Sequence, residues 1–123
     1  MTQENKELLI KDLCARLPYG VWIERKLKSC KFGAKCMLHA HDIDAIERGQ
    51  YDFYKPYLFP LSSMIEEQKR EFDISMDMGY AAAYNAEINC ANRMIDFFNK
   101  YHLDYRGLIP MGLAIDATGL NIY

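Results

Sequence analysis

The spacing of apolar residues predicts a helix at the start of the chain. Its apolar stripe repeats every three or four residues and consists of Leu9, Leu13, Cys14 and Leu17. Thr2 precedes this stripe and is a residue type that caps helices, so we expect the helix to start there and to run to about Arg16. Pro18 disfavours helical backbone at the residue before it, and Gly20 favours a turn. The helix should therefore end at this point.

An alternating pattern from residue 21 to 28 predicts a strand with two different faces. One face would carry Val21, Ile23, Arg25 and Leu27, and the other Trp22, Glu24, Lys26 and Lys28. Gly33 fits a turn, and residues 36–43 can return as a second strand, which together make a hairpin. Residues 42–49 allow two interpretations. They extend the second strand, or Asp44 caps a short helix that Gly49 ends.

Residues 51–60 are rich in aromatic side chains and contain Pro56 and Pro60. Because proline lacks a backbone N–H, we expect no long regular element here, but an extended connector pressed against the core.

Two helices are predicted in the second half. Ser63 and Glu66 form a capping-box pattern, so one helix should start there and run through Phe72. Residues 73–79 predict a break, and residues 81–101 a second helix. The apolar residues of that second helix fall at helical spacing at Ile88, Ala91, Met94 or Ile95, and Phe98.

Residues 103–123 contain three glycines and a proline, which favours short turns over the surface. Four apolar residues should hold them down, namely Leu108, Ile109, Leu113 and Ile115. The order of a helix, a small antiparallel sheet and then helices predicts the α+β class. A length of 123 residues suits one domain, 1–123, with a helix-and-sheet part at 1–60 and a mainly helical part at 61–123.

Composition limits the classes of function. Half of the residues are apolar, which is enough for a packed core, and the formal net charge is −2, which does not favour a general binder of nucleic acid or membranes. The first ten residues lack the pattern of a secretory signal, and no apolar run is long enough to cross a membrane. We therefore expect a cytoplasmic protein with free thiols at its four cysteines; secretion by another route would permit two disulfides.

Three stretches resemble a known group of proteins. They are Lys-Asp-Leu-Cys-Ala-Arg-Leu-Pro-Tyr-Gly at 11–20, Lys-Pro-Tyr-Leu-Phe-Pro-Leu-Ser-Ser-Met at 55–64 and Asp-Tyr-Arg-Gly-Leu-Ile-Pro-Met-Gly-Leu-Ala at 104–114. Together they cover about a quarter of the chain. They are similar to signatures of short uncharacterised proteins that are encoded in gut Bacteroidota genomes and their phages or mobile elements. The end of this chain, at 116–123, departs from the tail of that group. The resemblance implies no activity and assigns no catalytic residue.

The predicted hairpin contains four residue types that bind zinc, Cys30, Cys36, His39 and His41. On a regular strand, however, Cys36 would face one side and both histidines the other. The spacing also matches none of the established zinc patterns. We favour the interpretation that these are ordinary hairpin residues and expect no cofactor, with a structural zinc ion as the alternative.

The same region suggests a binding surface. Basic and aromatic side chains alternate along the hairpin, and the aromatic connector follows: Trp22, Arg25, Lys26, Lys28, Lys31, Phe32, Tyr51, Phe53, Tyr54 and Tyr57. Such a surface could contact a protein, or nucleic acid. The alternatives are a solvated strand whose lysines protect a sheet edge, and aromatic rings that pack in the core.

Candidates for catalysis are few. His102, Asp104 and Arg106 provide a base, an acid and a cation within five residues. Each also has an ordinary structural role, at a helix end, as a cap or in an ion pair. Cys14 lies in the apolar stripe of the first helix, where we expect an inert thiol.

These observations favour a small non-enzymatic interaction or regulatory module from a phage or mobile element. Its partner would be an unidentified protein, and self-association is possible. The alternative is a nucleic-acid-binding or zinc-stabilised module centred on residues 22–41, and a third hypothesis is an enzyme that uses His102, Asp104 and Arg106.

Overall fold

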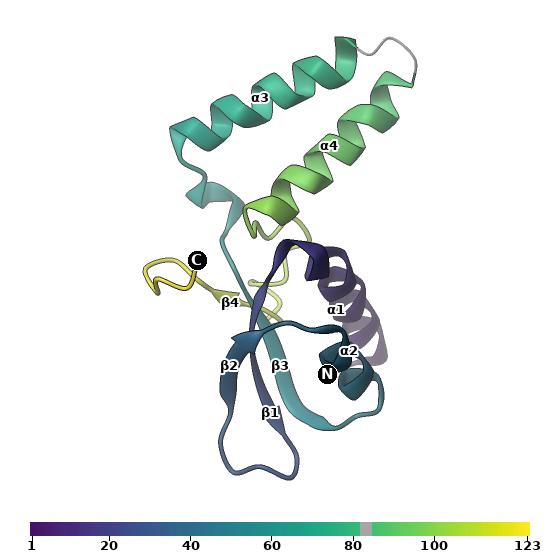
Figure 1. Cartoon of the computed structure of the whole chain (residues 1–123), viewed down its shortest axis with the longest axis vertical. Coiled ribbons are helices and arrows are strands. Elements are labelled where there is room, and N and C mark those ends of the chain that lie inside the picture. The colour runs from purple at the N-terminus through teal and green to yellow at the C-terminus, as the bar shows by residue number, and fades with distance from the viewer. Residues whose placement is uncertain (82–84) are drawn as a thin grey trace.

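A computed structural model describes residues 1–81 and 85–123 of the chain. Helix α1 (Gln3–Arg16) leads through a short 3-10 turn, η1 (Leu17–Tyr19), into a small sheet. Two further long helices, α3 (Glu66–Ala81) and α4 (Ala86–Lys100), stand on the sheet-containing body (Figure 1). The predicted α+β class is therefore confirmed, with the N-terminal helix first and most of the helical structure in the second half.

Helix α1 starts as its sequence predicts, because the Thr2 hydroxyl accepts a hydrogen bond from the Asn5 N–H at 3.1 Å. The buried face of the helix differs from the prediction. Leu9 and Leu13 are buried, but Cys14 is exposed, and the charged residues Asp12 and Arg16 are fully buried instead. An apolar pattern alone cannot show that two charges will neutralise each other inside the core.

The sheet has four strands in the order β2-β1-β3-β4. Strands β1 (Trp22–Leu27) and β2 (Ala34–Met37) form the predicted antiparallel hairpin, and β3 (Tyr51–Leu58) pairs with the other edge of β1. The short β4 (Ile115–Asp116) adds parallel to β3. Helices α1 and α2 (Ala40–Glu47) contribute to the same buried cluster as Ile23, so both pack on one face of the sheet.

The predicted second strand at 36–43 is wrong beyond Met37. Helix α2 (Ala40–Glu47) occupies that stretch, and the Asp42 carboxylate accepts a hydrogen bond from the His39 N–H at 2.8 Å at its start. The N-cap of this helix is therefore His39, five residues before Asp44, which was the cap in the alternative interpretation. Gly49 follows its end with a positive φ of 71°, as expected for a glycine that ends a helix.

The aromatic connector predicted at 51–60 is wrong, because most of it forms strand β3 in the middle of the sheet. Pro56 is compatible with this position. Strand β4 pairs only with Tyr57 and Leu58, so Pro56 has a neighbouring strand on one side only, where a sheet tolerates proline.

Helix α3 (Glu66–Ala81) starts later than predicted and continues through the expected break at 73–79. The Ser63 hydroxyl does not cap it, but donates to the Pro60 carbonyl within a 3-10 turn, η2 (Leu61–Ser63). Gly79 does not break the helix, because it lies against Cys90 of α4 (Ala86–Lys100), where its missing side chain allows close packing. The predicted helix at 81–101 agrees with α4, although residues 82–84 lie outside the described residues.

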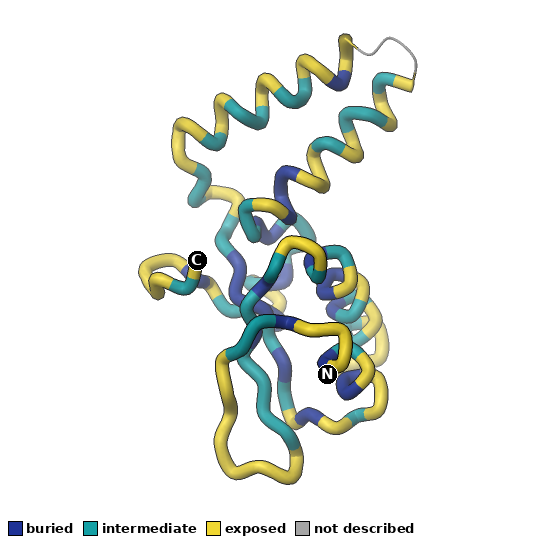
Figure 2. Tube along the Cα trace, viewed as in Figure 1, coloured by how far each residue is buried: buried dark blue, intermediate teal, exposed yellow. Residues whose placement is uncertain are grey.

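Buried side chains form two clusters. Figure 2 marks the buried residues along the chain. The larger joins α1, α2 and the sheet with the C-terminal segment, in which Leu108 and Leu113 are buried as predicted. The smaller is aromatic and lies at the base of α3 and α4, where the Phe72 ring contacts Phe97 and Phe98 at centroid distances of 5.3 and 5.8 Å. Away from that base, α3 buries only Gly79.

Candidate functional site

The structure exposes only some of the residues of the predicted binding surface at 22–57. Lys28, Lys31 and Phe32 are exposed around the end of the β1–β2 hairpin. Trp22, Lys26 and Phe53 are half-buried, and Lys26 forms an ion pair with Asp52. The rings of Tyr51, Tyr54 and Tyr57 are buried, which corrects their assignment to a surface. They are buried because β3 is an interior strand, where Tyr51 and Tyr54 join the larger core cluster and the Tyr57 hydroxyl donates to Glu24.

Arg25 of that predicted surface belongs to a buried polar cluster. Its Nε lies 3.2 Å from Asp42 Oδ1 and 3.1 Å from the Cys36 sulfur. The Tyr51 hydroxyl donates to the same Asp42 oxygen at 2.7 Å, and burial together with this hydrogen bond raises the pKa of Tyr51 to about 12. The cluster ties β1, β2 and β3 to the start of α2, which is a structural role.

The four predicted zinc ligands have separate surroundings. Cys30 is exposed, Cys36 contacts Arg25, and the His39 Nδ1 lies 2.9 Å from the Met37 carbonyl. The His39 and His41 rings stack on each other at 5.5 Å. Within residues 1–81 and 85–123 there is no group of three or more His, Cys, Asp or Glu side chains that could hold a metal ion.

His102, Asp104 and Arg106 do not converge. The His102 ring stacks on Tyr123 with a centroid distance of 3.6 Å. Asp104 accepts hydrogen bonds from the N–H groups of Leu108 and Ile109, at 2.8 and 2.9 Å, so it caps the following turn. Arg106 pairs with Asp12 at 3.1 Å. Asp104 and Arg106 therefore have the structural roles that were the alternatives to catalysis, whereas His102 packs on an aromatic ring instead of the expected interaction with the helix end.

The pair formed by Asp12 and Arg16 is a buried feature that sequence reasoning missed. Arg16 Nε lies 2.8 Å from Asp12, and Arg16 also donates to the Leu103 carbonyl at 2.7 Å. Arg106 contacts the second Asp12 oxygen, and both guanidinium groups lie 5.0 Å from the Tyr105 ring centroid. The spacing of four residues on the buried side of α1 was the only signal in the sequence.

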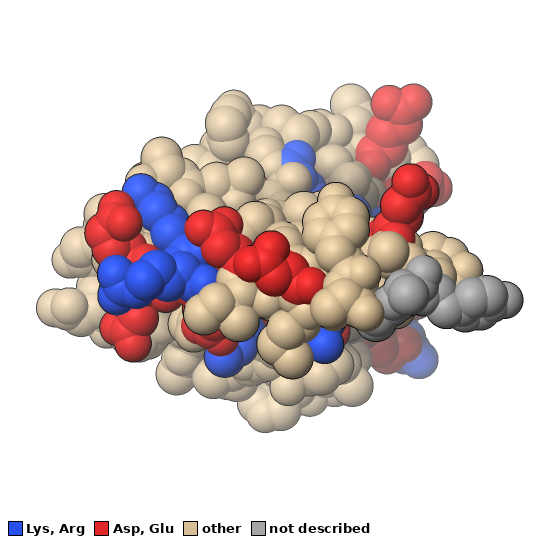
Figure 3. Space-filling view, turned by 90° about the horizontal axis from the view of Figure 1, so that it is seen from above, with Lys and Arg blue, Asp and Glu red and all other residues tan. Residues whose placement is uncertain are grey.

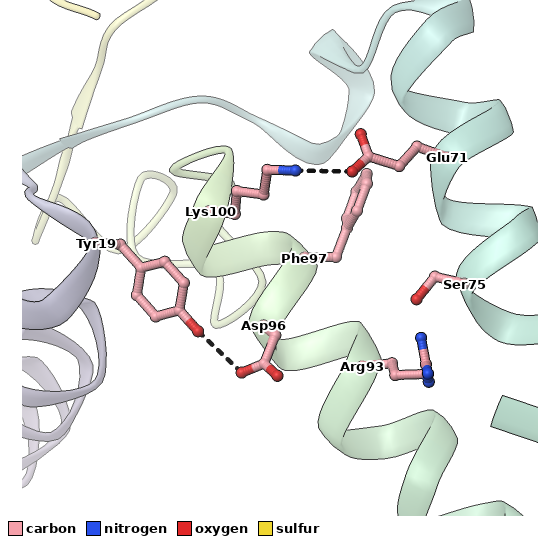
Figure 4. Close-up of a pocket in the computed structure, with 7 residues that line it drawn as sticks. All are labelled: Tyr19, Glu71, Ser75, Arg93, Asp96, Phe97 and Lys100. Carbon is pink, nitrogen blue, oxygen red and sulfur yellow. Dashed lines mark hydrogen bonds and ion pairs between the residues drawn. The ribbon is translucent and has the colours of Figure 1, made fainter. Parts of the chain in front are cut away.

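A pocket of about 270 Å³ lies where η1, α3 and α4 meet (Figure 4). Its charged groups are held by their neighbours. Tyr19 donates to Asp96 at 2.9 Å, and Lys100 donates to Glu71 at 2.8 Å. The hydrogen bonds from Lys100 and Tyr101 lower the pKa of the Glu71 carboxyl. Ser75 and Arg93 complete the wall, and these paired charges mainly connect the two helices to each other and to the body.

The most unusual surface belongs to the helical hairpin, by which we mean α3 and α4 together. It projects away from the body (Figure 1), yet it exposes large apolar side chains along both helices. Ile74 and Met78 of α3 are 61% and 54% exposed, and Ile88 and Ile95 of α4 are 60% and 40% exposed. Figure 3, which looks onto this end of the molecule, shows acidic and basic side chains intermingled beside extensive uncharged surface. Large exposed apolar side chains that gather on one part of a molecule are typical of protein interfaces.

The stripe of apolar residues on α4 was visible in the sequence, but the sequence did not show whether the fold buries these residues. Of the predicted stripe Ile88, Ala91, Met94 or Ile95, and Phe98, only Phe98 is buried. The amphipathic pattern therefore predicts burial that the described part of this chain does not provide.

Comparisons with known proteins leave the family open. No protein-family model, curated protein or solved structure significantly matches this chain. The surface of the helical hairpin must therefore be interpreted from its own chemistry. None of the helices in the described ranges has the length and apolar character needed to cross a membrane.

Proposed function

We propose that this chain is a small non-enzymatic interaction module, and that the helical hairpin is the part that contacts a protein partner. The observation that carries this proposal is the exposure of Ile74 and Met78 on α3 and of Ile88 and Ile95 on α4. Water contact with these side chains is unfavourable, and burial against a partner would remove it. The sheet and α1 act as the stable base on which the hairpin stands.

Site-specific photo-crosslinking tests this proposal. A photoreactive phenylalanine analogue would replace Tyr80 on α3, and in a matched control it would replace Phe32 at the end of the β1–β2 hairpin. Both aromatic side chains are exposed in the described structure. The expected result, in cells that express the chain with its neighbouring genes, is a defined crosslinked species from position 80 and none from position 32. Crosslinks from position 32 alone would assign the contact to the sheet hairpin and contradict the proposal.

The origin of the module is part of the proposal. The three stretches at 11–20, 55–64 and 104–114 support an accessory product of a phage or mobile element. Mapping the genes that flank this one tests the idea. Structural or packaging genes of a phage, or transfer genes of a mobile element, are the expected neighbours, and a conserved housekeeping operon would contradict it.

Nucleic acid is the second candidate, supported by the arrangement of lysines on the sheet. Lys35 and Lys55 both pair with Glu24 in the register, so they flank it on neighbouring strands. Lys26 lies on the same face, beside Phe53. Fluorescence anisotropy with a single-stranded oligonucleotide tests this candidate. Binding that weakens steeply with salt and is lost in the K35E/K55E variant would support it, and no binding at low salt would exclude it.

A further inference from the structure

Helix α4 presents two separate sides for packing. One side is occupied by α3: the Phe97 ring contacts Phe72, and the Cys90 thiol lies 3.6 Å from the Met76 carbonyl oxygen. A Cβ on Gly79 would lie 2.8 Å from the Cys90 sulfur, which shows how closely the two helices approach here. The other side carries Ile88, Ala91 and Ile95, which we call the α4 stripe, and all three side chains are exposed.

The α4 stripe has the spacing of a helix-pairing surface. Its residues follow one another by three and then four positions, which is the repeat that forms the seam between two packed helices. The central residue is Ala91, whose small side chain lets a second helix approach closely. The stripe therefore fits another helix better than it fits an irregular or extended segment.

Its chemistry is compatible with a second copy of the same helix. Ile88, Ala91 and Ile95 are all uncharged, so a two-fold arrangement brings no like charges together within the seam. In an antiparallel pair, Ile88 of one copy would lie near Ile95 of the other, with Ala91 close to the two-fold axis. The stripe of one copy would then be complementary to the stripe of the other.

The solvent-exposed area of the chain is also consistent with a second copy as the partner. The chain exposes 7472 Å², whereas a compact monomer of 14.3 kDa is expected to expose roughly 6800 Å². The excess of roughly 700 Å² approaches the area of about 800 Å² that each partner buries in an interface of standard size. The helical hairpin projects from the sheet-containing body (Figure 1), and exposed apolar residues lie along it.

We propose that the chain forms a symmetric dimer in which the α4 stripes of two copies pack antiparallel, giving a layer of four helices with α3 on each outer side. This inference rests on the proposed function and names a second copy as the partner of α4, whereas the crosslink from position 80 tests for a partner on α3. It leaves Ile74 and Met78 of α3 outside the interface.

Sedimentation velocity over a range of concentrations tests the dimer. The wild-type chain should sediment as a dimer that dissociates on dilution, and the Ile88→Glu variant should weaken the association by more than about tenfold, since a carboxylate would be buried in an apolar seam. The matched control is Met78→Glu, an equally exposed apolar position on α3, and it should leave the dimer intact. Circular dichroism checks that both variants remain folded.

A crosslink tests the geometry without disturbing the fold. Ala91→Cys, in a chain whose exposed Cys14 and Cys30 are changed to serine, should form a disulfide-linked dimer, because the two copies of residue 91 lie near the axis. The same substitution at Met78 should not. A wild-type chain that stays monomeric at high concentration, or a dimer that Ile88→Glu leaves unchanged, would overturn the inference. A hairpin crosslink to a different protein in cells would still support the proposed function.

Discussion

At the scale of single residues, two Asp–Arg pairs with the same spacing have opposite environments. Asp12 and Arg16 are fully buried on α1, whereas Asp44 and Arg48 at the end of α2 are largely exposed, at a similar separation of 3.1 Å. The first pair also holds Arg106 and the Leu103 carbonyl, so it connects α1 to the C-terminal segment. The second pair connects nothing else within the described structure.

We expect Asp12→Ala to lower the free energy of unfolding by about 3–5 kcal/mol, because it leaves two guanidinium groups without their buried carboxylate. The control, Asp44→Ala, should change it by less than about 1 kcal/mol, since solvent screens an exposed pair. Urea denaturation followed by circular dichroism measures both. Equal effects of the two variants would show that burial of the first pair adds nothing to stability.

His102 should make stability depend on pH. Burial, together with the positive charge of Arg16, lowers the pKa of His102 to about 4, and its buried Nδ1 has no hydrogen-bond partner in the described structure. The unfolded chain therefore binds more protons than the folded chain between about pH 4 and the usual histidine pKa of about 6.5. The stabilisation from the neutral ring is complete above that range and is lost as the pH falls through it.

The variant His102→Asn isolates this effect, because asparagine tolerates the positive φ of 57° at this position. Between pH 6.5 and 4.5, the wild-type melting temperature should fall more than that of the variant. Parallel melting curves for the two proteins would mean that His102 titrates normally in the folded chain. All other side chains are the same in the two proteins, so their contribution to the pH dependence cancels in the comparison.

At the scale of elements, the contact between α3 and α4 depends on a glycine. A Cβ added at Gly79 would lie 2.8 Å from the Cys90 sulfur and 3.3 Å from the Cys90 Cα. Alanine favours helix more than glycine does, by about 1 kcal/mol, so an exposed helical glycine would gain stability from this change. At position 79, steric overlap opposes that gain.

We expect Gly79→Ala to lower the free energy of unfolding by about 1–2 kcal/mol, the usual cost of overpacking reduced by the gain in helix propensity. Adding Cys90→Ala removes the sulfur and should restore part of the loss. Chemical denaturation of the two variants and of Cys90→Ala alone gives the coupling between the positions. If Gly79→Ala instead raised the free energy of unfolding, α3 and α4 would be able to move apart without a loss of packing energy.

At the scale of the whole molecule, the two buried clusters should differ in stability. The larger cluster joins α1, α2, the sheet and the C-terminal segment, whereas the distal part of α3 buries only Gly79. Regions with few buried apolar contacts open at lower free energy. We therefore expect the distal part of the helical hairpin to open more readily than the sheet-containing body.

Hydrogen exchange of the wild-type chain tests this difference. Amides of β1 and β3 should exchange slowest and those of distal α3 fastest. In a dimer through the α4 stripe, α4 should gain protection as the protein concentration rises, while α3 gains little. Protection of distal α3 equal to that of β3, at every concentration, would contradict this division of stability.

Local chemistry in the sequence determined the elements whose signals lie within a few residues. Thr2 caps α1, alternation marks β1, and the apolar spacing of residues 88–98 marks α4. The role of Asp104 was also within reach, because it caps N–H groups only four and five residues away, whereas Arg106 pairs with Asp12 at the other end of the chain. The α+β class followed from the order of these elements.

Tertiary structure alone decided where those elements lie and what they bury. Strand β3 is central because β4 pairs with it from more than fifty residues away, and α3 continues through Gly79 because Cys90 packs against it. Asp12 and Arg16 are buried because Arg106 and the Leu103 carbonyl complete their interactions. The exposure of the α4 stripe is also tertiary, since a helix shows its apolar side in sequence whether or not the same chain covers it.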